Sequence, residues 1–173
     1  MGSVKTDRYL RGGIVLLSIA LVYVLYAAIH EHVVVAGDQA PEFSLTTDNG
    51  RTVSMANFGG KLLVLNFWAS WCQPCVEETP SLSAFATQYA NKGVVVLAVS
   101  VDKDPAAYQK FIQRFRPAFL TVRDSKVHED YGTFIYPETY IIDQSGRVLE
   151  KYVEPKNWLD PSLVSAMESF LKT

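Results

Sequence analysis

Cysteine is scarce in this chain of 173 residues, which contains only Cys72 and Cys75. Secreted domains held together by several disulfides carry more cysteines, spread along the chain, so this class is excluded. Histidine is also scarce, the net charge is −2, and no block of Lys and Arg occurs. Proteins that bind nucleic acid carry a basic patch or stripe, so the sequence predicts no nucleic-acid partner.

Hydrophobic residues are plentiful, at 49% of the chain against 20% charged residues. This composition supports a buried core and excludes a disordered polymer. The length suits one domain of ordinary size with a short appendage. We therefore divide the chain into an N-terminal appendage, residues 1–37, and a domain, residues 38–173.

The appendage contains three basic residues near its N-terminus, followed by an uncharged apolar run from Gly12 to Ile29. The basic residues are Lys5, Arg8 and Arg11. A helix of this run spans about 27 Å, close to the ~30 Å hydrocarbon core of a bilayer. The run is therefore predicted to be a transmembrane anchor, followed by a short linker. Positive charge on its N-terminal side places the N-terminus in the cytoplasm and the domain on the extracytoplasmic side.

A cleaved signal peptide is the main alternative for this run, with a candidate cleavage site at Ala36-Gly37. Signal peptides usually have apolar segments of ~7–15 residues, and this run is longer and contains Tyr23 and Tyr26. Both interpretations place the domain outside the cytoplasm, whereas a buried core helix is disfavoured by the basic flank. His30 and His32 have no further ligands nearby, so we expect residues at the headgroup level and not a metal site.

The domain alternates strand and helix signals, which is typical of an α/β fold. Residues 62–67 and 94–101 are continuous apolar runs, as in strands covered on both faces, and residues 76–89 between them have helical spacing. Asp48-Asn49-Gly50 predicts the turn of a small hairpin. We also expect strands at 119–122, 139–142 and 148–153, and helices at 104–116, 126–131 and after 157, with Leu159, Leu163, Met167 and Phe170 as the apolar stripe. These elements predict a central mixed sheet with helices on both faces.

Both cysteines lie in one motif, Cys72-Gln73-Pro74-Cys75, directly after a buried strand and at the start of a helix. Free backbone N–H groups and the positive end of the helix dipole meet there, so a thiolate at Cys72 is stabilised relative to the thiol. Cys75, one turn further on, is expected to be more buried and to attack the mixed disulfide that Cys72 forms. A bridge that closes so small a loop stabilises a fold little, which indicates a chemical role.

Three other interpretations of the motif compete with thiol–disulfide exchange. A zinc site needs two more ligands, and His128 is the only histidine in the domain. The cysteines form an inert structural pair in the second interpretation, and carry a metal such as copper in the third. The redox interpretation is favoured over all three, and neither a metal nor a cofactor beyond the Cys72–Cys75 disulfide is expected.

The segment 66–80, NFWASWCQPCVEETP, resembles the active-site segment of the TlpA/ResA/CcmG group of thioredoxin-like proteins. The similarity extends over about residues 38–170 and includes YPETYIID at 136–143. The resemblance implies a thioredoxin-like fold with an N-terminal β-hairpin and an inserted helix after the second central strand. Peroxiredoxins share this fold but have Thr three residues before the reactive cysteine, where this chain has Ala69.

The resemblance also implies roles for individual residues. Cys72 matches the attacking thiol and Cys75 the resolving thiol. Pro80 matches a proline that kinks the active-site helix, and Pro137 a cis-proline that faces the cysteines, although most X–Pro bonds are trans. Glu78 matches a proton-handling acid; alternatively, it is an acidic residue in the first helical turn that stabilises the helix dipole.

The remaining candidates surround the motif. Asn66 occupies the place of an aspartate in cytosolic thioredoxins, and we expect it to be a supporting hydrogen-bonding residue at the strand end. Glu138, in a Pro-Glu-Thr pattern like that of the CcmG branch, is interpreted as part of an acidic rim or as an ordinary exposed glutamate. Residues that contact the substrate are expected at Trp71, Pro74, Tyr136, Pro137 and Glu138, whereas Trp68 and Trp158 are interpreted as packing residues.

The resemblance finally implies a reductant that acts in an oxidising compartment, often on apocytochrome c before haem attachment in cytochrome c biogenesis. Its own dithiol would be regenerated by a membrane electron donor of the CcdA/DsbD type. The alternative is a tethered module that binds a metal or a partner through its cysteines without turnover.

Overall fold

The computed structural model describes residues 3–29 and 33–172, without the side chains of residues 3–8, 10 and 27–29. The chain divides into two compact units, residues 1–32 and 33–173. His30 and His32, where the apolar run was predicted to end, lie outside the described residues. The predicted domain boundary at residue 37 stays a prediction.

The first unit contains one long helix, α1, at Ser3–Ile29. Its described apolar side chains between Ile14 and Tyr26 are exposed. A membrane span needs about 20 consecutive, predominantly apolar residues. No helix in the described part of the chain has enough length and apolarity combined to cross a membrane. The predicted transmembrane helix is therefore not supported.

The second unit is built on a five-stranded sheet in the order β5-β4-β3-β6-β7. Its strands are β3 Leu62–Trp68, β4 Val94–Ser100, β5 Leu120–Arg123, β6 Glu138–Asp143 and β7 Val148–Tyr152. β3 and β4 pair in parallel, as do β4 and β5, whereas β6 and β7 are antiparallel to their neighbours. The thioredoxin-like mixed sheet predicted from the sequence is thereby confirmed.

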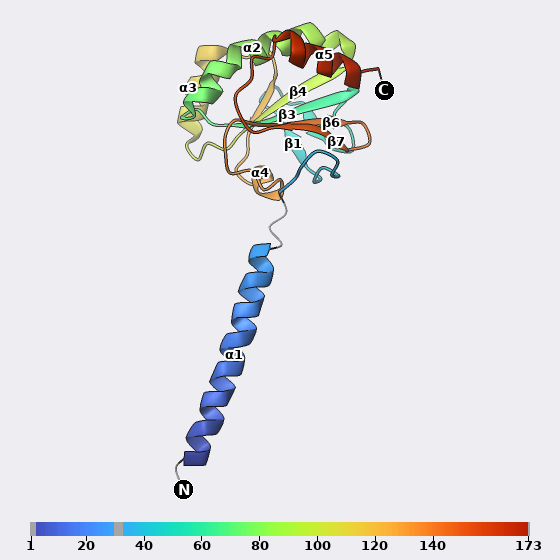
Figure 1. Ribbon diagram of the computed structural model, residues 1–173. Coiled ribbons are helices and arrows are strands. Elements are labelled where there is room, and N and C mark those ends of the chain that lie inside the picture. Colours follow the sequence, from blue (N-terminus) through green and yellow to red (C-terminus); the bar gives the residue numbers. More distant parts are fainter. Residues whose placement is uncertain (1–2, 30–32, 173) are drawn as a thin grey trace. The chain divides into compact units, whose positions relative to one another are not determined.

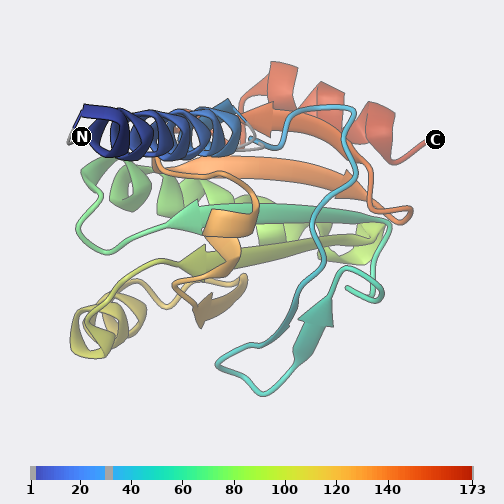
Figure 2. The ribbon, with the colours of Figure 1, turned by 90° about the horizontal axis from the view of Figure 1, so that it is seen from below.

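Helices cover both faces of the sheet (Figure 1). They are α2 Gln73–Tyr89, the short 3-10 helix η1 Ala90–Lys92, α3 Pro105–Phe115, α4 Val127–Asp130 and α5 Pro161–Phe170. The core is two clusters: one contains residues of α2, α3 and α5, and the other contains residues of α4 and the N-terminal hairpin. Figure 2 shows α4 in front of the sheet on this second face. Every residue of β3 is buried, so the strand that leads to the cysteines is fixed from both faces.

The hairpin predicted around Gly50 is present as β1 Ser44–Thr46 and β2 Thr52–Ser54, paired antiparallel. Most boundaries lie within one residue of the prediction, and two helix starts differ by three residues. α2 starts at Gln73, three residues before the predicted start at Val76, because Cys72 caps the helix and Pro74 suits its first turn. Leu159 lies before α5 and is 44% exposed, because Asp160 caps that helix one residue later.

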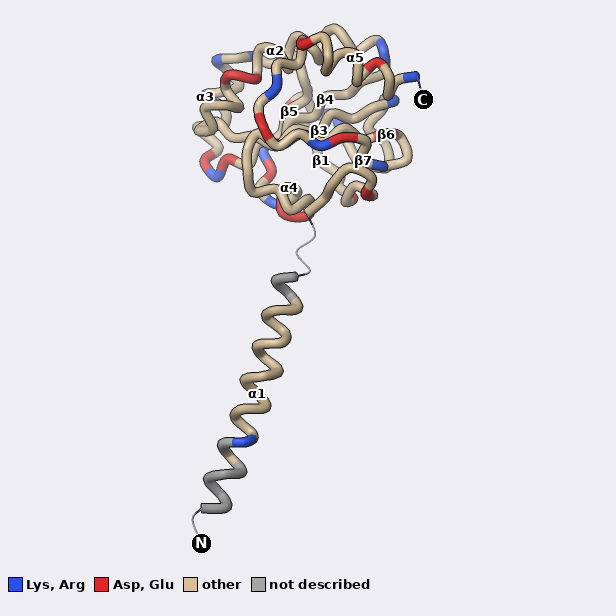
Figure 3. The backbone as a smooth tube through the Cα atoms, viewed as in Figure 1, with Lys and Arg blue, Asp and Glu red and all other residues tan. Residues whose placement is uncertain are grey.

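Charged residues of both signs are interspersed along the domain (Figure 3). Asp104 and Asp160 cap α3 and α5, each accepting a bond from a backbone N–H two residues on. No long run of one sign appears in the described part of the domain backbone.

Candidate active site

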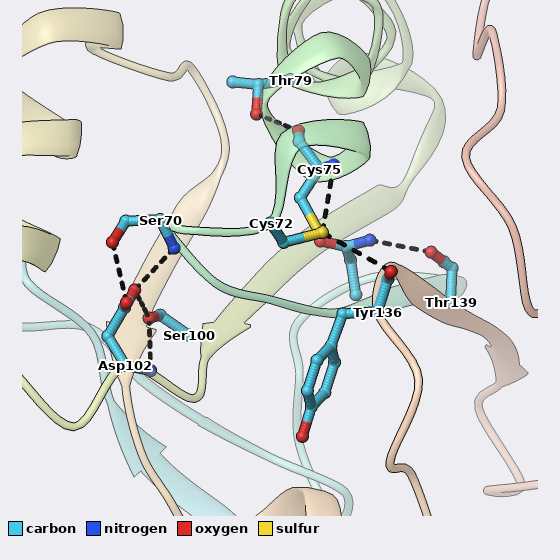
Figure 4. Close-up of a disulfide and its surroundings, with 9 residues drawn as sticks. Ser70, Cys72, Cys75, Thr79, Ser100, Asp102, Tyr136 and Thr139 are labelled. Carbon is cyan, nitrogen blue, oxygen red and sulfur yellow. Dashed lines mark hydrogen bonds between the residues drawn. A yellow bond between two sulfur atoms is a disulfide. The ribbon is translucent and has the colours of Figure 1, made fainter.

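Cys72 and Cys75 form a disulfide at the N-terminus of α2, with their Cα atoms 5.3 Å apart (Figure 4). Cys72 is the N-cap residue, and its sulfur accepts a hydrogen bond of 3.3 Å from the backbone N–H of Cys75. This is the helix-end position predicted from the sequence. A sulfur that accepts from a free N–H at a helix start is placed where negative charge is stabilised.

Both cysteines are buried in this disulfide form, Cys72 at 6% exposure and Cys75 at 3%. The prediction that Cys75 is the more buried residue has the right direction, but the difference is small. Both cysteines belong to the core cluster that contains residues of α2. The neighbouring residues Trp71 and Pro74 are exposed.

The segment before β6 faces the disulfide. The Tyr136–Pro137 peptide bond is cis, as predicted, and Pro137 is buried. The carbonyl oxygen of Tyr136 lies 3.5 Å from Cys72 Sγ (Figure 4). The Tyr136 ring is in edge contact with Trp71, at 6.0 Å between ring centroids. Trp71, Pro74, Tyr136 and Pro137, all predicted to contact substrate, therefore lie around the cysteines.

Asn66 lies on β3 beneath the motif and is buried. Its side-chain amide donates a 2.9 Å hydrogen bond to Thr139 Oγ1 on β6. This bond joins the strand that carries the cysteines to the strand that follows the cis-proline. The structure thus gives Asn66 the supporting hydrogen bond that the sequence predicted.

Asp102 is a buried acid of the site that was not predicted from the sequence. Its carboxylate accepts from the backbone N–H and the hydroxyl of Ser70, at 2.9 and 2.8 Å, and from the Ser100 hydroxyl at 2.6 Å (Figure 4). Ser70 lies two residues before Cys72, so this carboxylate holds the loop that presents the motif. An acid directly after a predicted buried strand was the signal available in the sequence.

Glu78 is 5% exposed and lies in the second turn of α2, since the helix starts at Gln73. The helix-dipole interpretation, which needs a first-turn acid, is therefore wrong for this residue. Trp158 Nε1 donates to Glu78 Oε1. Burial raises the pKa of Glu78 to about 7, with the Trp158 bond and Lys156 acting in the opposite direction. This acid is half ionised near neutral pH, which suits a group that takes up and returns protons.

Glu138 is buried at 3% exposure, so neither an exposed glutamate nor an acidic rim describes it. Its Oε1 accepts from Lys151 Nζ at 2.7 Å, from Thr133 Oγ1 at 3.0 Å and from the Tyr140 hydroxyl. Burial of a carboxylate requires such partners, and Lys151 on β7 supplies the charge. Because Glu138 directly follows Pro137, this network of hydrogen bonds and the ion pair hold the cis-proline segment in place.

Among the described residues, no group of three or more His, Cys, Asp or Glu side chains is arranged to hold a metal ion. Pro80 lies inside α2, and its missing N–H removes one hydrogen bond of that helix.

A thioredoxin-like sheet, a cysteine pair at a helix N-terminus and an opposing cis-proline define the thioredoxin class of proteins. The family model described as Redoxin matches residues 35–167 of this chain. The chain belongs to the Redoxin family.

Several relatives define its branch. The chain is 36% identical over 139 residues to the thiol-disulfide oxidoreductase ResA of Geobacillus thermodenitrificans, covering 78% of this chain and 80% of the relative. It is 37% identical over 120 residues to the thioredoxin-like protein YneN of Bacillus subtilis, covering 68% and 71%. A Chlorobium tepidum protein assigned as a thiol:disulfide interchange protein DsbE superposes with a TM-score of 0.72 at 29% identity, over 81% of this chain and 99% of that one. This chain is a thiol–disulfide oxidoreductase similar to the TlpA/ResA/CcmG group.

Proposed function

We propose that this protein is a reductant of disulfides in proteins outside the cytoplasm. The Cys72 thiolate attacks one sulfur of a substrate disulfide, the substrate S–S bond breaks, and the other substrate sulfur leaves as a thiolate that takes up a proton. Cys75 then loses its proton, and its sulfur attacks Cys72 Sγ. The bond between Cys72 and the substrate breaks, the Cys72–Cys75 disulfide forms, and the second substrate sulfur leaves. Two electrons pass from the protein to the substrate.

The observation that carries this proposal is the position of Cys72. Its sulfur caps α2 and accepts from the Cys75 N–H, which favours a thiolate once the disulfide is reduced. The Tyr136 carbonyl beside it offers a backbone acceptor to an extended substrate segment, a form of β-strand addition. Trp71, Pro74, Tyr136 and Pro137 form the contact surface in this proposal.

Glu78 handles the proton of the resolving step in this proposal. It lies three residues after Cys75 on the same helix, and residues at this spacing are neighbours on one helix face. Both side chains are buried, so the Cys75 proton has few routes to solvent. The Glu78 carboxylate accepts this proton during attack by Cys75 and returns it when a dithiol donor reduces the protein again.

We place the reaction outside the cytoplasm because the basic residues and apolar run at the N-terminus are typical of export signals. A membrane dithiol donor of the CcdA/DsbD type restores the dithiol, and oxidised apocytochrome c is a substrate in this proposal. A fusion of residues 1–40 to a reporter active only in an oxidising compartment should be active. Loss of this activity on deleting residues 12–29 is expected, and reporter activity without them would overturn the placement.

Reduction of insulin by dithiothreitol tests the chemistry. The parent should accelerate it, whereas Cys72→Ser should fall to the uncatalysed rate. Equal rates for the two proteins would contradict the proposal, and stoichiometric bound metal in purified protein would favour a binding module.

Trapping identifies the substrate. Cys75→Ser removes the sulfur that resolves the mixed disulfide, so Cys72 should stay attached to its substrate in cells. Recovery of apocytochrome c on Cys72 is expected, whereas a broad set of unrelated oxidised proteins would contradict the assignment to cytochrome c maturation.

A further inference from the structure

Trp158 is completely buried beside the active-site helix, 80 residues away in sequence from the acid that it contacts. Its indole ring packs against Phe85 on α2 at 5.4 Å and against Tyr152 at the end of β7 at 6.1 Å between centroids. Its backbone N–H donates to Ser81 Oγ at 3.3 Å. Both the ring and the backbone of Trp158 are therefore fixed against α2, one helical turn beyond Glu78.

The two oxygens of Glu78 have different surroundings. Oε1 accepts the indole N–H of Trp158, whereas Oε2 is buried and has no hydrogen-bond partner at normal geometry among the described residues. An unsatisfied buried oxygen costs free energy that folding would ordinarily avoid, and such exceptions call for a functional explanation. An oxygen that accepts a proton from Cys75 needs to be without a hydrogen-bond donor while the carboxylate is ionised.

We propose that Trp158 is a positioning residue for the proton transfer of this site, with its indole N–H holding Glu78 Oε1 and thereby leaving Oε2 to exchange a proton with Cys75. The inference rests on the proposed function of Glu78 as the proton acceptor of the resolving step. The Cys75 S–H bond breaks, its proton goes to Oε2, and the electron pair left on sulfur forms the bond to Cys72. The donated N–H stabilises the ionised carboxylate that must be present before this transfer.

Other charged groups near Glu78 act from the segment that contains Trp158 and from α2 itself. Lys156 is half-buried and pairs with Glu154 at 2.6 Å. The backbone N–H of Lys156 and, to a smaller extent, its charge both lower the pKa of Glu78. Glu77 precedes Glu78 but is exposed. Tyr152 is in edge contact with the Trp158 ring. Of these groups and Trp158, only Trp158 donates a side-chain hydrogen bond to the Glu78 carboxylate at normal angles.

Trp158→Phe removes the N–H and keeps an aromatic ring in the core. The rate of the resolving step should rise with pH through a midpoint near the Glu78 pKa of about 7 in the parent. Loss of one hydrogen bond to the carboxylate should move this midpoint upward by about one pH unit. The variant should therefore resolve a peptide mixed disulfide about fivefold more slowly at pH 7 and at nearly the parent rate at pH 9.

Trp68→Phe is the matched control. Trp68 is also buried, at 3% exposure, but its indole N–H has no hydrogen-bond partner in the described residues. Trp68→Phe removes the same side-chain volume from the core as Trp158→Phe but no hydrogen bond. The pH midpoint of its resolving step should therefore match that of the parent. A ¹³C NMR titration of the Glu78 carboxyl in the disulfide form gives the same midpoint without turnover and reports directly on a destabilised variant.

The outcomes separate the two claims. If Glu78→Gln leaves the pH profile of the parent unchanged, Glu78 has no proton-handling role, and the positioning role of Trp158 fails with it, whereas disulfide reduction by Cys72 and Cys75 is unaffected. If Glu78→Gln abolishes the midpoint near 7 but Trp158→Phe leaves it in place, only the role of Trp158 fails. Equal shifts of the pH midpoint in Trp158→Phe and Trp68→Phe would show that lost packing causes the shift. This result would also overturn the positioning role of Trp158. A shift confined to Trp158→Phe supports the positioning role.

Discussion

Burial of Glu78 brings its pKa near neutrality and lowers the free energy of unfolding at pH values where the side chain is ionised. Burial raises this pKa from 4.5 to about 7, so the folded protein binds a proton more tightly than the unfolded chain does. The contribution of Glu78 to stability is then greatest below pH ~4.5, falls between pH ~4.5 and 7, and levels off above pH 7. Function and stability therefore oppose each other at this residue.

Glu78→Gln should remove this opposition. The amide keeps an acceptor for Trp158 and has no charge to bury, so at pH 8 the oxidised variant should be more stable than the parent by about 2–3 kcal/mol. At pH 4 the two should be nearly equal. Urea unfolding at both pH values measures the difference, with exposed Glu77→Gln as control. A stability gain that does not depend on pH would contradict the assigned cause.

Asp102 illustrates a residue whose effect on the site is indirect. Asp102→Ala leaves the Ser70 N–H and the Ser70 and Ser100 hydroxyls without their acceptor. The expected loss is about 2–4 kcal/mol of stability and on the order of tenfold in the disulfide exchange rate, because the loop before Cys72 loosens. Asp104→Ala, which removes only a helix cap, should cost about 1 kcal/mol and leave the exchange rate unchanged. A full exchange rate in folded Asp102→Ala would show that other contacts hold the loop.

At the scale of elements, β6 and β7 are joined by a buried ion pair in addition to their backbone bonds. Lys151 lies opposite Tyr140 in the strand register, with its ammonium 2.7 Å from Glu138 and 5.0 Å from the centre of the Tyr140 ring. Removing one charge of a buried pair leaves the other uncompensated, whereas replacing both is often neutral. We therefore expect a large interaction energy between Glu138 on β6 and Lys151 on β7.

A double-mutant cycle measures this coupling. Lys151→Met should destabilise the protein by about 3 kcal/mol, whereas the double variant E138Q/K151M should lie within about 1 kcal/mol of the parent. Chemical denaturation of the four proteins gives the interaction energy. Additive losses in the double variant would show that the two charges do not depend on each other.

Elements with strong local signals were predictable from the sequence. The apolar runs that form β3 and β4, the Asn49-Gly50 turn and the cysteine motif each depend on neighbouring residues, and all were placed correctly. The supporting contacts of the site were not predictable in this way, because they join distant residues. Trp158 reaches Glu78 across 80 positions, and whether Glu138 is exposed or buried depends on Lys151 of another strand.

At the scale of the whole molecule, the buried network behind the cis-proline segment extends to the first residues of the domain. Val34 is buried, its N–H donates to the Tyr131 carbonyl at 3.2 Å, and its carbonyl accepts from Lys151 Nζ at 2.9 Å. Lys151 thus contacts both Glu138 and the chain at the start of the second unit. The domain should therefore depend on residues that precede the predicted boundary at 37.

Two truncations test this dependence. Removing residues 1–32 keeps both Val34 bonds, so the remaining domain should reduce insulin disulfides as fast as the full chain. Removing residues 1–36 deletes these bonds and the Val34 side chain from the core, which should cost about 2–4 kcal/mol of unfolding free energy. Thermal and urea unfolding of the two proteins measure the difference. Equal stability would place the functional start of the domain after residue 36, and a loss of activity in the longer fragment would show that residues 1–32 contribute to the site itself.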